Sequence, residues 1–163
     1  MLIKLDLKFS HLFIYTFSLS LASIFFALYY QYIKNYPPCE LCIFQRIPYF
    51  CISLFSVFGL ITQKYKENTL MLILLIFVSS FLLSFFHVGV EQDLWKYGSS
   101  CSNNVGDFEN IEDLREFLSK VPITKCDEVL VSFWGFSMAS LNMIFSFLNV
   151  VILIIFYKKF KNE

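Results

Sequence analysis

The sequence predicts an all-α membrane protein, a bundle of four transmembrane helices that forms one domain over residues 1–163. A chain of this length suits a single domain. Apolar residues make up 57% of it and its mean hydropathy is +0.62, which is more apolar than a soluble domain usually is. Four apolar stretches each reach the roughly 20 residues that a helix needs to cross a bilayer. They lack the alternation of barrel strands, so helices are the structure that satisfies their backbone in lipid.

The four predicted helices cover residues 12–33, 43–61, 70–90 and 133–157. The first has basic flanks and a Ser20-Leu21-Ala22 sequence that imitates a signal-peptide cleavage site. Its apolar run is longer than a typical signal core, so we expect a retained helix.

A long outer loop, residues 91–132, separates the third and fourth helices. Within it Phe108, Ile111, Leu114 and Leu118 recur at helical spacing, and acidic residues occupy the other faces. This pattern predicts a short amphipathic helix in the second outer loop, which either lies on the membrane surface or packs onto the bundle as a lid.

The distribution of charge predicts the orientation. Basic residues are dense near both termini and in the 63–69 turn, and sparse on the other side of the membrane. The positive-inside rule then places both termini in the cytoplasm and the two outer loops outside. Such a topology suits the cytoplasmic (inner) membrane of a bacterium with a periplasm. An aromatic belt is expected towards the outer surface, formed by Tyr29, Tyr30, Tyr32, Tyr36, Tyr49, Trp95 and Trp134. The balance of 13 basic and 13 acidic residues gives no sign of nucleic-acid binding.

Cys39 and Cys42 form a dithiol at the start of the second predicted helix. Two intervening residues let the sulfurs meet in a small reversible disulfide. If a helix begins near Cys42, the four-residue spacing puts Arg46 on the same face as that thiol. A cation and a helix N-terminus both favour the reactive thiolate. The pattern indicates redox chemistry at the edge of a bilayer.

Three further cysteines allow several interpretations. Cys101 and Cys126 lie in the outer loop, where they suit either a structural disulfide or an exchange partner for the dithiol. A four-cysteine zinc site would require thiols that stay reduced outside the cytoplasm, so no metal is expected. Haem attachment would need His at position 43, which is Ile. Cys51, inside the second helix, suits a small core hydrophobe.

Three motifs resemble those of the bacterial disulfide bond formation protein B (DsbB) family, in the same order. They are residues 38–46 (PCELCIFQR), 86–95 (FHVGVEQDLW) and 125–139 (KCDEVLVSFWGFSMA). Trp134 and Phe136 stand where Leu is common in that family, and Leu141 where Trp is common. Vitamin K epoxide reductase-like proteins share a four-helix core, but their loop cysteines precede the membrane pair, and here the membrane pair comes first.

This resemblance implies an enzyme, a quinone-dependent protein-disulfide oxidoreductase. It would reoxidise a periplasmic DsbA-like thioredoxin-fold oxidase and pass the electrons to ubiquinone or menaquinone. The implied catalytic residues are Cys39, Cys42, Cys101 and Cys126. Cys101 would form the mixed disulfide with the partner, Cys126 would relay electrons to Cys39, and Cys42 would engage the quinone. A monomer is expected, with resting disulfides Cys39–Cys42 and Cys101–Cys126.

The resemblance also implies quinone-contacting residues. Arg46 would stabilise the Cys42 thiolate and developing charge on the quinone. His87, which from sequence alone suits an interfacial residue bonded to backbone, becomes a hydrogen-bond donor or proton source. Glu91, one turn on, would orient His87 or relay protons. Gln45 either faces the headgroups or donates to the quinone.

Two other hypotheses remain open from the sequence. One is a non-catalytic membrane scaffold or metal-binding protein with structural cysteines. The other keeps the chemistry but serves a dedicated oxidase with few substrates.

Overall fold

The computed structural model describes residues 2–62, 65–97, 126, 129 and 131–161, and these are mostly helical. The elements are α1 (Leu2–Tyr32), α2 (Glu40–Phe44), α3 (Arg46–Ile61), α4 (Lys66–Glu91), β1 (Ser132–Phe133), β2 (Phe136–Ser137) and α6 (Met138–Lys161). Four helical segments are long and apolar enough to cross a membrane. The predicted four-helix membrane fold is therefore confirmed. The predicted amphipathic helix and Cys101 lie outside the described residues.

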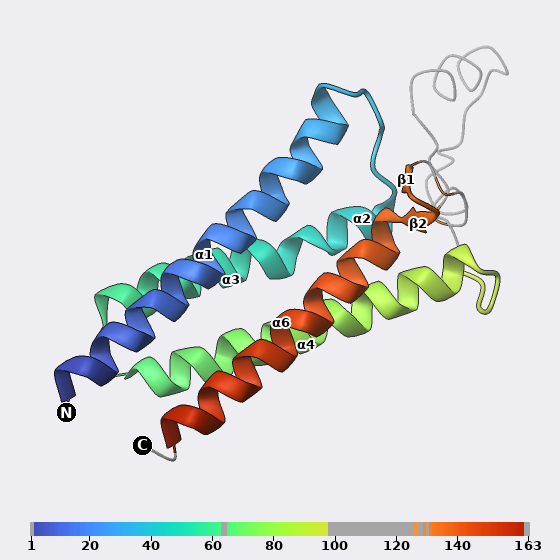
Figure 1. Cartoon of the computed structure of the whole chain (residues 1–163). Helices are drawn as coiled ribbons and strands as arrows, with labels where there is room; N and C mark the ends of the chain where they lie inside the picture. The colour runs from blue at the N-terminus through green and yellow to red at the C-terminus, as the bar shows by residue number, and fades with distance from the viewer. Residues whose placement is uncertain (1, 63–64, 98–125, 127–128, 130, 162–163) are drawn as a thin grey trace, which may run out of the picture.

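The long helices run side by side, and the two termini lie at the same end of the bundle (Figure 1). α1 packs along α3, α4 packs along α6, and α3 contacts α4. The short helix α2 and the β1–β2 hairpin lie at the opposite end from the termini (Figure 1). This arrangement brings the link between α1 and α2 and the hairpin that precedes α6 together at one end.

The helix boundaries differ from the predicted ones, most of all at the starts of α1 and α6. α1 begins at Leu2 rather than residue 12, because residues 2–11 contain no glycine or proline to interrupt a helix. α6 begins at Met138 rather than residue 133, because residues 132–137 form an antiparallel hairpin. Its two-residue turn, Trp134-Gly135, has positive φ at both positions (50° and 86°), as tight hairpin turns of this twist require.

The second predicted helix is interrupted. It begins at Glu40 and breaks at Gln45, which separates α2 from α3. Pro48 lacks the N–H that would bond the carbonyl of Phe44, so the helical ladder is open at this point. The start of α2 is capped by Cys39, whose sulfur accepts a hydrogen bond from the N–H of Cys42 at 3.3 Å.

The centre of the bundle combines large apolar and small polar side chains. Phe13 and Phe77 are fully buried. Thr16 of α1 and Ser56 of α3 share a hydrogen bond of 2.8 Å, and a Cβ on Gly59 would lie only 2.6 Å from the ring of Phe13. Close approach of helices at small residues is typical of packing in membranes, where lipid is as apolar as the side chains.

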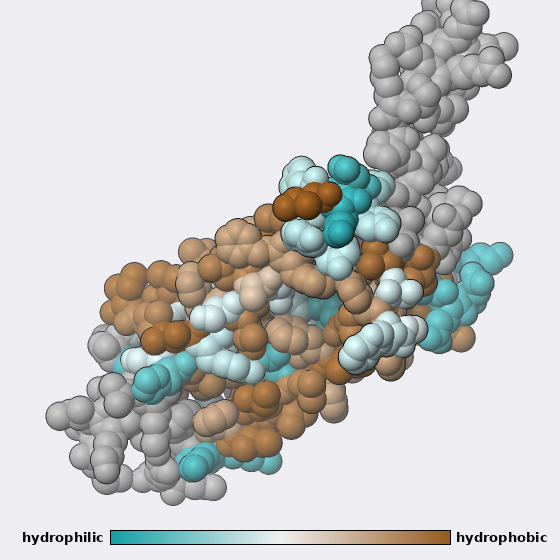
Figure 2. All heavy atoms as spheres, turned by 45° about the horizontal axis from the view of Figure 1, so that its top comes forward, coloured by the Kyte–Doolittle hydropathy of each residue, from teal (hydrophilic) through white to brown (hydrophobic). Residues whose placement is uncertain are grey.

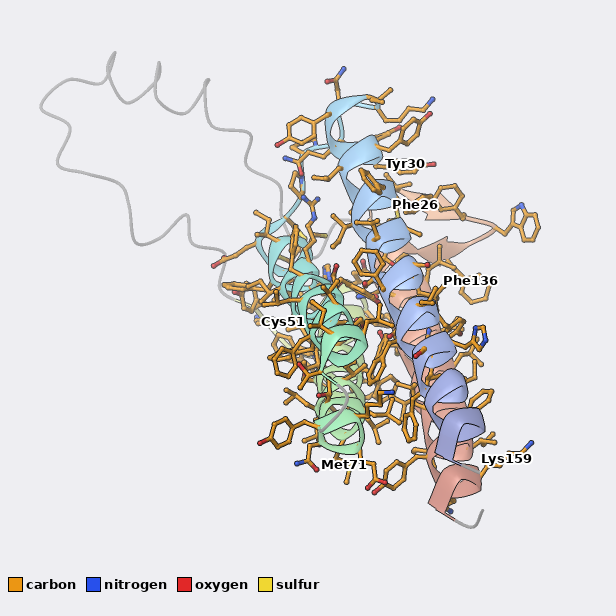
Figure 3. All side chains as sticks on the ribbon, turned by 90° about the vertical axis from the view of Figure 1, so that its left-hand side faces the viewer. Phe26, Tyr30, Cys51, Met71, Phe136 and Lys159 are labelled. Carbon is orange, nitrogen blue, oxygen red and sulfur yellow. The ribbon has the colours of Figure 1, made fainter. Side chains whose placement is uncertain are left out.

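Large apolar side chains also cover the outside. In the face drawn in Figure 2, hydrophobic residues cover much of the length of the bundle, and the most hydrophilic ones gather towards its ends. Figure 3 shows Cys51 on the side of α3 that is turned away from α1 in that view. Tyr29, Tyr32, Tyr36 and Trp134 are exposed, as the aromatic belt requires. Tyr49 is not part of that belt: it is only 5% exposed, because its hydroxyl turns inward to polar groups of α6.

Candidate functional site

The dithiol lies where the link after α1 enters α2. The sulfur atoms of Cys39 and Cys42 are 2.8 Å apart, and both cysteines are free. The Cys39 thiol is the donor and Cys42 is the acceptor of that contact. Cys39 is buried and Cys42 is half-buried, so the pair is shielded from solvent although it lies near the end of the bundle.

Cys126 packs directly against this pair. It is buried in a small cluster with Cys39, Leu41 and Val90, and Trp95 packs on the cluster. The backbone N–H of Leu41 hydrogen-bonds to the Cys126 sulfur, which also interacts with the Cys39 side chain. Three of the four predicted catalytic cysteines therefore meet at one place.

Two of these thiols hold their protons tightly. The hydrogen bond to Cys42, together with burial, raises the pKa of Cys39 to about 12. Burial raises the pKa of Cys126 to about 11, although the backbone N–H of Leu41 opposes that shift. Both groups are therefore thiols at neutral pH.

His87 stands beside the dithiol on α4 and is 2% exposed. Its Nε2 lies 3.6 Å from Cys39 Sγ and 3.9 Å from an oxygen of Glu91. Its Nδ1 lies 2.9 Å from the side-chain amide nitrogen of Gln45. Gln45 is buried and turned inward, so the alternative in which it faces the headgroups does not describe its position.

Arg46 has a partner other than the one expected, and Glu91 has one in addition to His87. An Nη of Arg46 donates to the side-chain oxygen of Gln31, which ties α3 to α1, and no hydrogen bond between Arg46 and Cys42 is present among the described residues. Arg46 and Cys42 nevertheless line the same cavity. Glu91 accepts a hydrogen bond from the Ser137 hydroxyl and so links α4 to β2.

The sequence analysis missed a set of polar side chains behind His87. Asn142 of α6 donates to Gln45 at 3.1 Å and to Ser84 at 2.7 Å, and accepts from the hydroxyl of Tyr49. A polar side chain within a membrane helix is costly unless it has partners, and it often marks function. Asn142, a polar side chain within the apolar fourth helix, carried that signal.

An apolar cavity of about 650 Å³ opens from the dithiol into the bundle. Cys39, Cys42, Arg46 and His87 line its polar end, and side chains of α1 and α6 form its walls. Among the wall residues, Phe26, Ile144 and Leu148 are also exposed on the outside of the membrane spans. The cavity therefore reaches the surface that faces lipid. Figure 3 shows Phe26 and Tyr30 projecting from the outer part of α1, where both contact Phe133 of the hairpin.

One metal-compatible group is present among the described residues. Single donor atoms of Cys39, Cys42 and His87 all lie within 4.8 Å of one another. Thiolate and imidazole are ligands that soft or borderline metals prefer. The sequence analysis did not single out this combination, because His87 is 45 residues from Cys42.

Comparison with known proteins identifies the family. The sequence model of the family described as "Disulfide bond formation protein DsbB" matches residues 9–156, nearly the whole chain. The chain belongs to the DsbB family. An uncharacterized protein of Rickettsia prowazekii is 30% identical over 146 residues, which cover 87% of this chain and 85% of that protein.

Two relatives carry the name "Disulfide bond formation protein B". The one from Cupriavidus pinatubonensis is 31% identical over 107 residues, 66% of this chain and 60% of the relative. The one from Cupriavidus metallidurans is 44% identical over 45 residues, 28% of each chain. As a DsbB family member, the protein is a multi-pass membrane protein with a disulfide oxidoreductase-type role in disulfide bond formation.

Proposed function

We propose that this DsbB family protein is a thiol:quinone oxidoreductase of a bacterial inner membrane. It reoxidises a periplasmic DsbA-like dithiol oxidase and passes the electrons to ubiquinone or menaquinone. One observation carries the proposal: a buried Cys39–Cys42 dithiol forms the polar end of an apolar cavity that reaches the lipid-facing surface.

The first half of the reaction is disulfide exchange on the outer side. A partner thiolate attacks Cys101 of a Cys101–Cys126 disulfide, and Cys126 leaves as a thiolate. Cys126 then attacks Cys39 of the Cys39–Cys42 disulfide, and Cys42 leaves as a thiolate. The second partner thiol attacks the mixed disulfide at the partner sulfur, which oxidises the partner and releases Cys101. The packing of Cys126 against Cys39 supports this order.

The second half restores the membrane pair. The Cys101 thiolate attacks Cys126 of the Cys39–Cys126 disulfide, which rebuilds the loop disulfide and releases Cys39. Cys39 and Cys42 are then both reduced, as in this structure. The net result is one new disulfide in the partner and one dithiol that must be reoxidised.

The cavity fits a quinone. Its volume of about 650 Å³ and apolar walls suit a ring with a prenyl tail, and its polar end offers hydrogen-bonding groups. A bound quinone supplies an acceptor for the two electrons and two protons of the dithiol. Arg46 contributes positive charge on the cavity wall that Cys42 also lines, which favours a thiolate there. His87 holds a ring nitrogen towards Cys39 at the same end.

The test is quinone reduction by the purified protein, with a reduced thioredoxin-like periplasmic donor. We expect loss of donor thiols in step with quinone reduction, abolition in Cys42→Ser, and normal rates in Cys51→Ser, which alters a cysteine of the same helical span outside the cavity. A normal rate of quinone reduction in Cys42→Ser, equal to that of Cys51→Ser, would exclude Cys42 from the pathway.

A second candidate function is metal binding, favoured by the donor atoms of Cys39, Cys42 and His87. Failure of the folded protein to reduce either quinone, together with stoichiometric Zn²⁺ binding that is lost in Cys42→Ser, would support it instead.

A further inference from the structure

We infer that Ser84, Asn142 and Gln45 are positioning residues that fix the tautomer of the His87 imidazole, with the proton of the neutral ring on Nε2, directed at Cys39. They form a buried hydrogen-bonded chain across α4, α6 and the α2–α3 break. Which atom donates and which accepts in each hydrogen bond of this chain follows from the bond at its Ser84 end. The consequence for catalysis rests on the proposed function, but the placement of the proton does not.

The fixed end of the chain is the backbone carbonyl of Ser80. Ser84 Oγ donates its only proton to that carbonyl at 2.8 Å. A carbonyl cannot donate, so this bond has one possible direction. The Ser84 hydroxyl therefore acts as an acceptor towards Asn142, 2.7 Å away, and the atom of Asn142 that faces it must be the amide nitrogen.

The donor and acceptor roles of Asn142 then determine those of Gln45 and of the His87 imidazole. The same Asn142 nitrogen donates to Gln45 Oε1 at 3.1 Å, so the Gln45 amide nitrogen points the other way, to His87 Nδ1 at 2.9 Å. An amide nitrogen only donates, so Nδ1 must accept and carries no proton. The proton of a neutral ring is therefore on Nε2, which lies 3.6 Å from Cys39 Sγ and 3.9 Å from Glu91.

The reverse arrangement would break one of these contacts. Turning both amides over would place Asn142 Oδ1 against Ser84 Oγ, and the Ser84 hydroxyl would have to leave the Ser80 carbonyl to donate to it. The observed arrangement keeps both hydrogen bonds of that hydroxyl. Tyr49 does not decide the direction, because its hydroxyl can both donate and accept. Ser84, His87 and Gln45 are all buried, so water does not compete for these bonds.

The inferred tautomer has a specific use in the proposed reaction. When the Cys101 thiolate attacks Cys126 of the Cys39–Cys126 disulfide, the S–S bond breaks and Cys39 leaves with the electron pair. The Nε2–H of His87 is the donor that faces this sulfur, and it stabilises the departing thiolate. With the proton on Nδ1, a lone pair would face that thiolate instead.

Nitrogen-15 NMR of the reduced protein in lipid nanodiscs tests the proton placement directly. The chain has two histidines, and His11 is exposed, so it serves as an internal reference. We expect wild-type His87 to show a protonated Nε2 and an unprotonated Nδ1. In Asn142→Leu the ring should become a mixture of tautomers, whereas the matched control Asn149→Leu, a buried asparagine of α6 bonded to Tyr15 and the Phe145 carbonyl, should resemble wild type.

A second variant covers the case in which Asn142→Leu does not fold. Gln45→Glu keeps the shape but can only accept, so it should draw the proton onto Nδ1 and reverse the pattern. A wild-type ring with Nδ1 protonated, or a Gln45→Glu ring identical to wild type, would overturn the inference.

Activity then separates this inference from the proposed function. Asn142→Leu should lower kcat about tenfold with little change in KM for quinone, because a proton donor is misplaced while the apolar walls are intact. The NMR measurement needs neither quinone nor partner. A normal tautomer pattern without quinone reduction would reject the function alone. Normal quinone reduction with unchanged tautomers in Asn142→Leu would reject the positioning chain alone.

Discussion

Cys39 serves two neighbours with one sulfur atom. It accepts the N–H of Cys42, which caps α2, and it donates its own proton to Cys42 Sγ. The same sulfur atom therefore caps the helix and belongs to the redox pair. A substitution at Cys39 changes the local helix start as well as the chemistry, whereas a substitution at Cys42 keeps the backbone N–H of the cap.

Removing the acceptor should release the Cys39 proton. Because the hydrogen bond to Cys42 is the main reason that the pKa of Cys39 rises from 9.0 to about 12, Cys42→Ala should lower that pKa. Alkylation of Cys39, followed by mass spectrometry against pH, should still be increasing above pH 10 in the wild type and should level off at lower pH in the variant. Cys51→Ala is the control, and an identical pH profile in Cys42→Ala would contradict this account.

Cys39 and Cys126 should form a disulfide when their usual partners are absent. Their side chains pack in one buried cluster, and disulfides require such proximity. In a Cys42→Ser, Cys101→Ser double variant, mild oxidation should join Cys39 to Cys126 and leave Cys51 free, as detected in non-reduced peptide maps. A free Cys126 after oxidation would show that the observed packing is not populated in the membrane.

The sequence could locate the chemistry but not its supporting residues. Motif spacing was sufficient to single out Cys39 and Cys42, and the family resemblance added His87, which the fold brings beside them. Asn142 and Tyr49 were missed because a membrane helix is apolar on its lipid-facing and its buried sides alike, so the sequence does not reveal which side points inward.

At the scale of elements, the end of α4 depends on a glycine. A Cβ on Gly89 would overlap the ring of Trp95, which folds back over the helix and donates to the Phe86 carbonyl at 2.7 Å. The chain turns there because Asp93 adopts a positive φ of 56° and the N–H of Leu94 bonds the Gly89 carbonyl. This turn places Trp95 against the cluster that holds Cys126.

Gly89→Ala should therefore destabilise the protein by about 1–3 kcal/mol, because an extra methyl group is forced into a packed contact. The same change in an ordinary exposed helix would stabilise it by roughly 1 kcal/mol. A thermal melt of the purified protein gives the sign, and faster alkylation of Cys126 should accompany the loss. A raised Tm would show that Trp95 is not held on α4.

Element boundaries were predicted less well than element existence. Apolar length was enough to identify all four spans. The hairpin before α6 was missed because its two strands have only two residues each, and its turn uses Trp134 at a φ that favours glycine or asparagine. Pro48 marks a kink in the second span, but the break lies three residues earlier, at Gln45, because proline affects the carbonyl of the preceding turn.

At the scale of the whole molecule, both termini lie at the end opposite the dithiol. The density of lysine near that end predicts that it is cytoplasmic. Green fluorescent protein fused to the C-terminus should therefore fluoresce, and alkaline phosphatase fused there should be inactive. In intact cells a membrane-impermeant maleimide should label Cys101 in Cys126→Ser. An active phosphatase fusion would reverse the topology.

Because Phe26, Ile144 and Leu148 line the cavity and are exposed on the membrane spans, the proposed quinone would arrive by way of the hydrocarbon phase. Its relevant concentration is then its mole fraction in the bilayer. Each added methylene of a ligand tail favours transfer from water into lipid by about 0.8 kcal/mol. Short-tailed quinone analogues should thus have a high apparent Kd when it is expressed as a concentration in water. They should still saturate the protein at a mole fraction in the bilayer similar to that of long-tailed ones. The lipid reservoir, more than the fit of the tail in the cavity, would set apparent affinity.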